Sequence, residues 1–164
     1  DDAGPDMRFY GFTAAGLAVS TTTTTTAGIT PCPATLLLGE SSEELHHIRR
    51  FQNNILPKTE RGEKLTALYY QYSHELFSMF TGDNELRTAV HNLLLDLMPY
   101  LTGALQGDSM VMGKSTRGNT NIVFDKILSL SGPEMRKTVL ELKRDFNEGK
   151  LFRQMQINIS FEGR

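Results

Sequence analysis

This chain of 164 residues has no tryptophan and only one cysteine, Cys32. A single thiol excludes a disulfide within the chain and a metal site built from several cysteines. Long apolar stretches are also missing, because charged residues or proline interrupt every apolar run well before the ~18 residues that a transmembrane helix needs. We therefore predict no transmembrane segment, no metal site and no cofactor.

The chain also lacks an excess of charge of either sign. Its formal net charge is −2, from 17 Lys and Arg and 19 Asp and Glu. Nucleic-acid binding depends on clustered positive charge, which this balance does not supply. We therefore predict no nucleic-acid partner, and the length of the chain indicates a single globular domain.

Charge is absent altogether from residues 9–39, and dense, mixed charge begins at Glu40. The first part is rich in β-branched and aromatic residues and contains the six-threonine run 21–26, which is a poor helix former. We divide the chain into an extended, uncharged arm, residues 1–39, and a helical domain, residues 40–164. The apolar residues that we assign to assembly in the arm are Phe9, Tyr10, Phe12, Leu17 and Val19.

About five helices are expected after the arm, each with an apolar stripe and end signals. Ser41 with Glu44 forms a capping-box pattern for the first helix, Thr59 caps the second, and Ser131 with Pro133 opens the last. The expected ranges are 41–57, 59–82, 84–105, 121–130 and 131–149. Residues 107–120, with three glycines and no period, are interpreted as a mobile loop.

The C-terminus changes to the alternation of a β-strand, which ends the helical domain. Its apolar positions, also assigned to assembly, are Met155, Ile157, Ile159 and Phe161. A lone strand is unstable, and the arm is the other strand-forming segment, so we expect the two to pair within one subunit or between subunits. The fold class expected is mainly α, a bundle with an N-terminal β arm and a C-terminal strand (α+β).

Cys32 is the one candidate catalytic residue. A nucleophilic cysteine needs a neighbour that lowers its pKa, usually a histidine or a helix N-terminus, and no spacing places His46, His47, His74 or His91 beside it. A buried, inert thiol between two prolines is the commoner outcome.

The cluster Tyr69, Tyr70 and Tyr72 is interpreted as core packing with hydroxyls at the rim, and a binding surface is the alternative.

Three segments, CPATLLLG (32–39), EELHHIRRFQNNIL (43–56) and GEKLTALYYQYS (62–73), resemble in their order the CFI-box domain of bacterial proteins. The box here is one residue shorter than in that family, Pro33 replaces its aromatic residue, and His74 stands where proline is usual. The resemblance implies a bacterial accessory domain without an established activity. The matching residues are Cys32, Ala34, Thr35, Gly39, Glu44, Ile48, Arg49, Phe51, Leu56, Gly62, Leu65, Tyr69, Tyr70 and Ser73.

These observations lead us to expect a non-enzymatic structural protein that associates with itself. The arm would add as a strand to an exposed sheet edge of another copy, and head-to-tail contacts of this kind form open polymers. The sequence DDAGPD at the start fits export from a bacterial cell after removal of a signal. The alternatives are a monomeric bacterial module that binds a protein or small ligand, and an enzyme that depends on Cys32.

Overall fold

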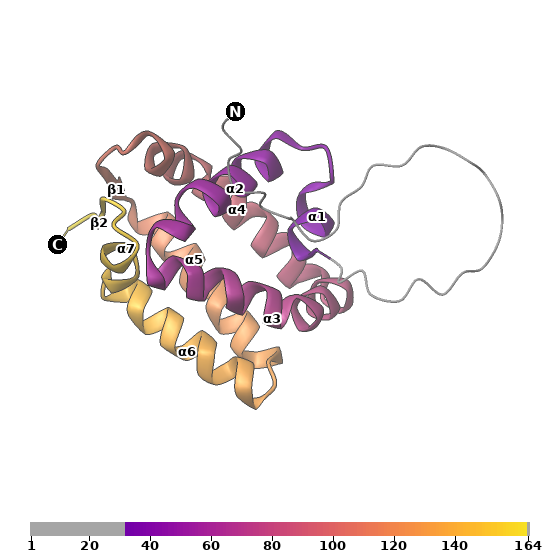
Figure 1. Cartoon of the computed structure of the whole chain (residues 1–164). Coiled ribbons are helices and arrows are strands. Elements are labelled where there is room, and N and C mark those ends of the chain that lie inside the picture. Colours follow the sequence, from indigo (N-terminus) through magenta and orange to yellow (C-terminus); the bar gives the residue numbers. More distant parts are fainter. Residues whose placement is uncertain (1–31, 164) are drawn as a thin grey trace, which may run out of the picture.

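The computed structural model describes residues 32–163, in which seven α-helices, one 3-10 turn and two short strands follow one another (Figure 1). The mainly helical, α+β fold class predicted from the sequence is confirmed. The elements are α1 (Pro33–Leu38), α2 (Glu43–Asn54), η1 (Leu56–Lys58), α3 (Glu60–Gly82), α4 (Asn84–Gln106), β1 (Met110–Met112), α5 (Lys114–Leu130), α6 (Pro133–Asn147), α7 (Lys150–Gln154) and β2 (Ile159–Phe161).

Side-chain caps fix where three of the helices begin. The Ser42 hydroxyl accepts a hydrogen bond from the Leu45 N–H at the start of α2, and Thr59 and Asp83 cap α3 and α4 in the same way. Each of these side chains satisfies a backbone N–H that has no partner inside the helix. The prediction for Thr59 is confirmed, whereas the cap of α2 lies at Ser42 and not at Ser41.

The last long helix begins differently from the prediction. Ser131 does not cap α6, because its hydroxyl donates to the Ile127 carbonyl and so ends α5. Gly132 takes the N-cap position of α6, and Pro133 occupies the first turn, where its missing N–H costs nothing.

The apolar stripes of the helices meet in two clusters of buried residues. The first lies between α3, α4, α5 and α6, and Leu36 and Leu37 of α1 pack against it. The second lies at the other end of α4, where it joins the sheet to α7 and the end of α6. Figure 1 accordingly shows α1 and the sheet at opposite ends of the molecule. The buried members of the second cluster are Ile55, Met112, Phe146, Phe152, Met155, Ile157 and Phe161.

The predicted boundary of the arm at residue 39 is wrong for its last residues. Pro33–Leu38 forms helix α1, which packs against α2, α3 and α4. Proline at the first helical position presets φ for a helix, and burial of the following leucines stabilises it. The helical domain therefore includes α1, and the rest of the predicted arm, residues 1–31, lies outside the described residues.

The segment 107–120, predicted as a mobile loop, is instead ordered secondary structure. Gly107 ends α4 with a left-handed backbone (φ 80°), β1 follows, and α5 begins already at Lys114. The C-terminal strand pairs with β1, so the expectation that only the arm could supply its partner is also wrong. Burial of Met112, which is 1 % exposed, explains why this short segment forms a strand.

Candidate functional site

Within residues 32–163 the two strands form a parallel sheet with one open edge. Met110 lies opposite Ile159, and its N–H donates to the Asn158 carbonyl over 2.8 Å. Further along, the Glu162 N–H donates to the Met112 carbonyl over 3.0 Å. In a parallel ladder alternate residues of a strand face its partner, so both polar backbone groups of Val111 point away from β2.

Val111 is well placed to accept a further strand. The residue is 63 % exposed, and no described residue makes a hydrogen bond with its backbone. Gly113 is the next outward-facing position after Val111, but its N–H already donates to the Tyr100 hydroxyl over 3.3 Å. The free part of the edge is therefore short. The outward-facing positions that remain on β1 and just before it are Ser109 and Val111, which we call the β1 edge.

The opposite edge of the sheet is blocked by its own backbone. The Ile159 N–H donates to the Ile157 carbonyl over 2.9 Å, which closes a tight turn at the start of β2. A strand arriving on this side would have to break that bond. Natural sheets often close an edge with such an irregularity, and the β1 edge is therefore the better acceptor.

The residues assigned to assembly at the C-terminus have another role in the structure. Met155, Ile157 and Phe161 are 5–8 % exposed and belong to the second cluster, and Ile159 is half-buried against it. Their side chains hold the core of this chain, so they do not present an apolar face to a partner. Phe9, Tyr10, Phe12, Leu17 and Val19, the assembly residues of the arm, lie outside the described residues.

A hollow of about 350 Å³ lies beside the sheet. It combines apolar side chains of both strands with the polar groups Arg153, Asn158 and Ser160. Such a surface could receive alternate side chains of an added strand, as peptide-binding sheet edges do. Its lining residues are Ser109, Met110, Val111, Arg153, Ile157, Asn158, Ile159 and Ser160.

Cys32 lies at the other end of the molecule, at the N-cap of α1. Its sulfur is 3.3 Å from the Tyr69 hydroxyl, which also accepts a hydrogen bond from the Ala34 N–H. Burial alone would raise the pKa of the thiol, but hydrogen bonds from the Thr35 and Tyr69 side chains and from nearby N–H groups outweigh it and lower the pKa. Burial raises the pKa of the Tyr69 phenol, and so do its hydrogen bond and its electrostatic interaction with Cys32. The phenol therefore keeps its proton and can donate it in a hydrogen bond to the sulfur.

A base for catalysis is not among the described hydrogen-bond partners of Cys32. Those partners are the hydroxyl groups and backbone groups named above, and no histidine of residues 32–163 is one of them. Cysteine enzymes usually use a neighbouring histidine to activate the thiol and to protonate the leaving group. The geometry of Cys32 is therefore that of a half-buried residue that fastens α1 to α3.

Other residues of the CFI-box resemblance also meet in the structure. Gly62, at the start of α3, lies so close to η1 that a Cβ there would be 2.1 Å from the Leu56 carbonyl oxygen. Ser73 is 2 % exposed and donates to the Tyr69 carbonyl one turn earlier in α3. The structure thus gives these residues packing roles that do not depend on the resemblance.

The three tyrosines of α3 have different environments. Tyr69 and Tyr72 are half-buried, and the Tyr72 hydroxyl lies 3.2 Å from that of Thr138 on α6. Both thus follow the predicted core packing with hydroxyls at the rim, whereas Tyr70 is 61 % exposed and contacts Gln52.

Across the described residues no group of three or more His, Cys, Asp or Glu could hold a metal ion.

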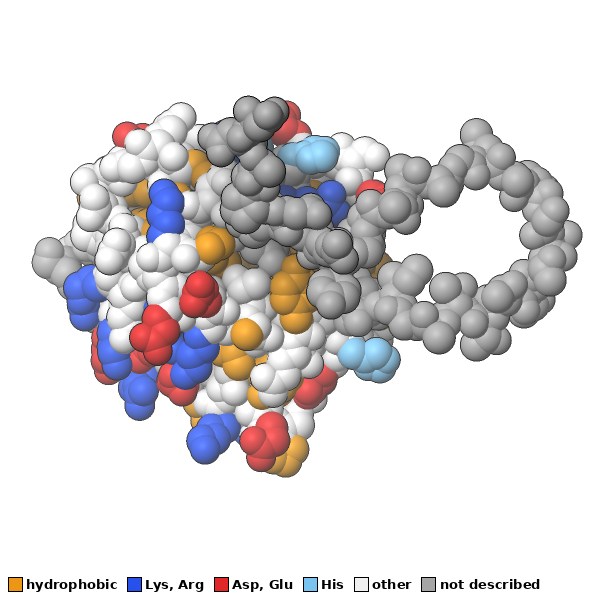
Figure 2. All heavy atoms as spheres, in the orientation of Figure 1, with side chains coloured by type: hydrophobic (Ala, Val, Ile, Leu, Met, Phe, Trp, Pro, Cys, Tyr) orange, Lys and Arg blue, Asp and Glu red, His pale blue; other side chains and the backbone are white. Residues whose placement is uncertain are grey.

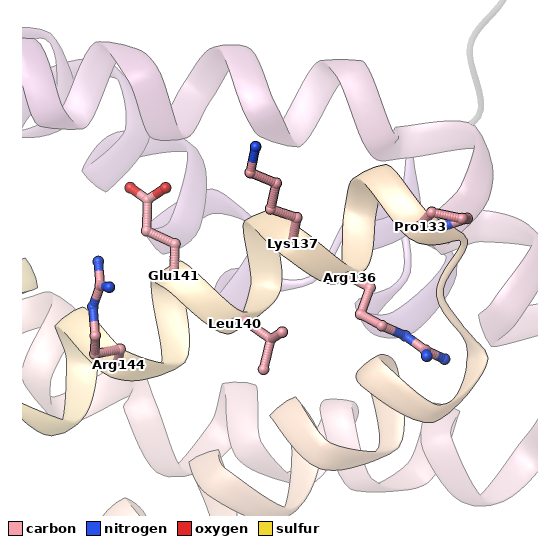
Figure 3. A pocket seen from close by; sticks show the side chains of 6 residues that line it. All are labelled: Pro133, Arg136, Lys137, Leu140, Glu141 and Arg144. Carbon is pink, nitrogen blue, oxygen red and sulfur yellow. The ribbon is translucent and has the colours of Figure 1, made fainter.

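A second, shallow hollow of about 570 Å³ runs along the outer face of α6. Lys137, Glu141 and Arg144 project from one side of the helix, and Arg136 and Leu140 project from the other (Figure 3). Figure 2 shows side chains of both charges gathered over this part of the molecule. Leu140 is 53 % exposed among these charged side chains.

Sequence reasoning missed both the β1 edge and the α6 face. The three letters MVM of β1 carry too little periodicity to be told from a loop. In the sequence, α6 has the pattern of an ordinary solvated helix surface. The one sequence signal of the α6 face is Leu140, an apolar residue outside the apolar stripe.

Among the helices of residues 32–163, none combines the length and apolarity that crossing a membrane requires.

Comparison with known proteins adds no further constraint on the site. No protein-family model, no curated protein and no solved structure matches this chain.

Proposed function

We propose that this chain is a non-enzymatic structural protein that associates with copies of itself by strand addition. The donor would be the uncharged arm with Phe9, Tyr10, Phe12, Leu17 and Val19, and the acceptor would be the β1 edge of another copy. The observation that carries the proposal is that, among residues 32–163, the outward-facing backbone of Val111 is unpaired in a sheet of two strands. A two-stranded sheet is marginal by itself, and a third strand would stabilise it.

Backbone hydrogen bonds alone would make this contact weak. Ser109 and Val111 offer about four backbone groups, and each hydrogen bond contributes roughly 0.5–1.5 kcal/mol net. Apolar side chains of the arm would add to this by covering the hollow beside the sheet, at roughly 25 cal/mol per Å² of apolar surface buried. The apolar residues of the arm, rather than its threonines, are therefore expected to dominate the affinity.

The contact can be blocked without removing the arm. Proline at position 111 removes an N–H that β2 does not use, so Val111→Pro is compatible with an edge strand. It deprives an added strand of its central donor. We expect Val111→Pro and a deletion of residues 1–30 each to abolish concentration-dependent association in sedimentation velocity, while Val111→Thr, which keeps the N–H and the β propensity, associates like the wild type.

Circular dichroism of each variant checks that the helical fold is retained. If the deletion and Val111→Pro both associate like the wild type, strand addition is excluded.

A monomeric binding module is the second candidate function. The surface it would use is the α6 hollow, where the exposed Leu140 lies among charged side chains. A wild-type chain that stays monomeric at every concentration tested would favour this candidate over self-association. A Cys32-dependent enzyme has less support, because the described thiol has no histidine partner.

A further inference from the structure

The outer face of α6 carries positive charge that its neighbours do not neutralise. Among the described residues, Arg136 and Lys137 form no ion pair. Arg144 lies 3.7 Å from Asp145 Oδ1, an oxygen that Lys150 also approaches to 3.7 Å. An incoming acidic group would thus find three basic side chains with little or no competition.

The acid on this face is already engaged. Glu141 receives Arg61 at 3.2 Å and Lys64 at 3.8 Å, both from α3. It therefore offers little repulsion to an acidic ligand. Leu140 is exposed on the same side of α6 as Arg136, and Lys137 projects from the other side (Figure 3), so the face fits a segment that combines carboxylates with an apolar side chain.

This chain contains one such segment outside the described residues. Residues 1–7 read DDAGPDM, with Asp1, Asp2 and Asp6, no basic residue, and Met7 as an apolar neighbour; the next acid is Glu40. We propose that residues 1–7 dock on the outer face of α6 of the same chain. The carboxylates pair with Arg136, Lys137 and Arg144, and Met7 covers Leu140.

The start of the described chain lies close enough for this contact. Cys32 touches Tyr69, and Tyr72, one turn further along α3, touches Thr138 of α6. The 24 residues from 8 to 31 can span up to about 80 Å. Exposed ion pairs are individually weak, but a tether of this length gives an effective concentration on the order of a millimolar, so a weak contact is populated.

A nitroxide label tests the contact in the full-length chain. The label is attached through Ala3→Cys in a Cys32→Ser background, at a concentration where sedimentation shows a monomer. Because nitroxide broadening falls off with the sixth power of distance, even a partly occupied contact broadens nearby amides strongly, and we expect the amide signals of Lys137 and Leu140 to lose more than about half their intensity. Signals of β2 should keep theirs. The loss should disappear in about 1 M NaCl, where the Debye length is about 3 Å.

Charge reversal supplies the control. Asp1→Asn, Asp2→Asn and Asp6→Asn together, or Arg136→Glu with Lys137→Glu, should remove the effect. Combining the latter pair with Asp1→Lys and Asp2→Lys should restore it. Reversal of the exposed Arg50 and Arg87, on α2 and α4, should leave it unchanged.

Three outcomes would overturn the proposal. The first is that the α6 signals keep their intensity, and the second is that the variant with Asp1→Asn, Asp2→Asn and Asp6→Asn loses as much intensity as the unsubstituted chain. The third is that, in a mixture of labelled and isotope-enriched chains, the loss arises only between molecules. The proposal does not rest on strand addition, since a chain that never self-associates can still show the contact.

Discussion

At the scale of single residues, Gly62 shows how one missing side chain fixes a turn. It is the third residue of α3, and its N–H donates to the cap Thr59. The chain has just passed through η1, whose Leu56 carbonyl carbon and Cα both lie 2.7 Å from the position of a Cβ. Those atoms are backbone, so no rotamer change can relieve the contact.

Gly62→Ala should therefore destabilise the protein. A methyl group forced against backbone displaces η1 or the start of α3, and we expect a loss of roughly 2–4 kcal/mol in the free energy of unfolding, a size that backbone clashes and overpacking reach. Gly118, inside α5, is the matched control because nothing lies within 4 Å of its Cβ position. Gly118→Ala should stabilise the protein by roughly 0.5–1 kcal/mol through helix propensity.

Urea denaturation followed by circular dichroism measures both changes. Equal effects of the two alanines would show that the packing at Gly62 does not limit stability.

At the scale of elements, a buried ion pair joins α3 to α6. Arg61 Nη2 lies 2.7 Å from Asp145 Oδ2, and the two side chains are 10 % and 3 % exposed. Arg61 also reaches Glu141, and Lys150 of α7 approaches Asp145. Removal of one partner from a buried pair is costly, because the other charge is then left in a poorly solvated place.

Asp145→Asn should consequently cost about 3–5 kcal/mol of the free energy of unfolding. Asp125, which pairs with Lys143 across α5 and α6, gives the control because its side chain is 63 % exposed. Asp125→Asn should change stability by less than about 1 kcal/mol, as exposed pairs do. Thermal and chemical denaturation of both variants measures the difference, and a mild effect at Asp145 would mean that water solvates Arg61 once the pair is broken.

The same scale shows what the sequence could predict. The long helices α2, α3, α4 and α6 were predictable because each repeats an apolar stripe over several turns, and the cap Thr59 stands at a position that local hydrogen bonding sets. Only the second part of α5 was predicted, because its first turns, from Lys114, lie in the segment that was interpreted as a loop. The short elements α1, β1 and α7 were not. They span three to six residues and are stabilised by tertiary contacts that bury residues such as Met112 and Phe152. The local sequence pattern does not predict these contacts.

The candidate site depended on those short elements. The C-terminal alternation correctly predicted a strand that needs a partner, but the strand is only Ile159–Phe161, and the predicted position Met155 ends α7 instead. Its actual partner was hidden among the glycines of residues 107–113. Sequence reasoning could therefore indicate strand addition as a hypothesis, but the outward direction of the Val111 backbone, which no residue of 32–163 pairs with, follows only from the register of β1 on β2.

At the scale of the whole molecule, two core clusters share the same helices. Leu86, Val90 and Leu93 of α4 belong to the first cluster, and the end of the same helix packs on the second. α6 likewise contributes to both. Leu97 and Phe124 contact both clusters. Unfolding of either cluster would expose apolar surface on helices that also form the other cluster, and would therefore destabilise it.

The described domain should consequently unfold in one cooperative transition. Val90→Ala in the first cluster and Phe152→Leu in the second should each lower the free energy of unfolding by roughly 1–3 kcal/mol. Because the helices are shared, each variant should lower the free energy of opening equally for the amide of Val90 and for that of Met112 in native-state hydrogen exchange. Val111→Thr, exposed on the sheet, should change neither amide. If Phe152→Leu accelerates exchange at Met112 alone, the two clusters unfold separately, and the sheet with its β1 edge can open while the helices around the first cluster stay folded.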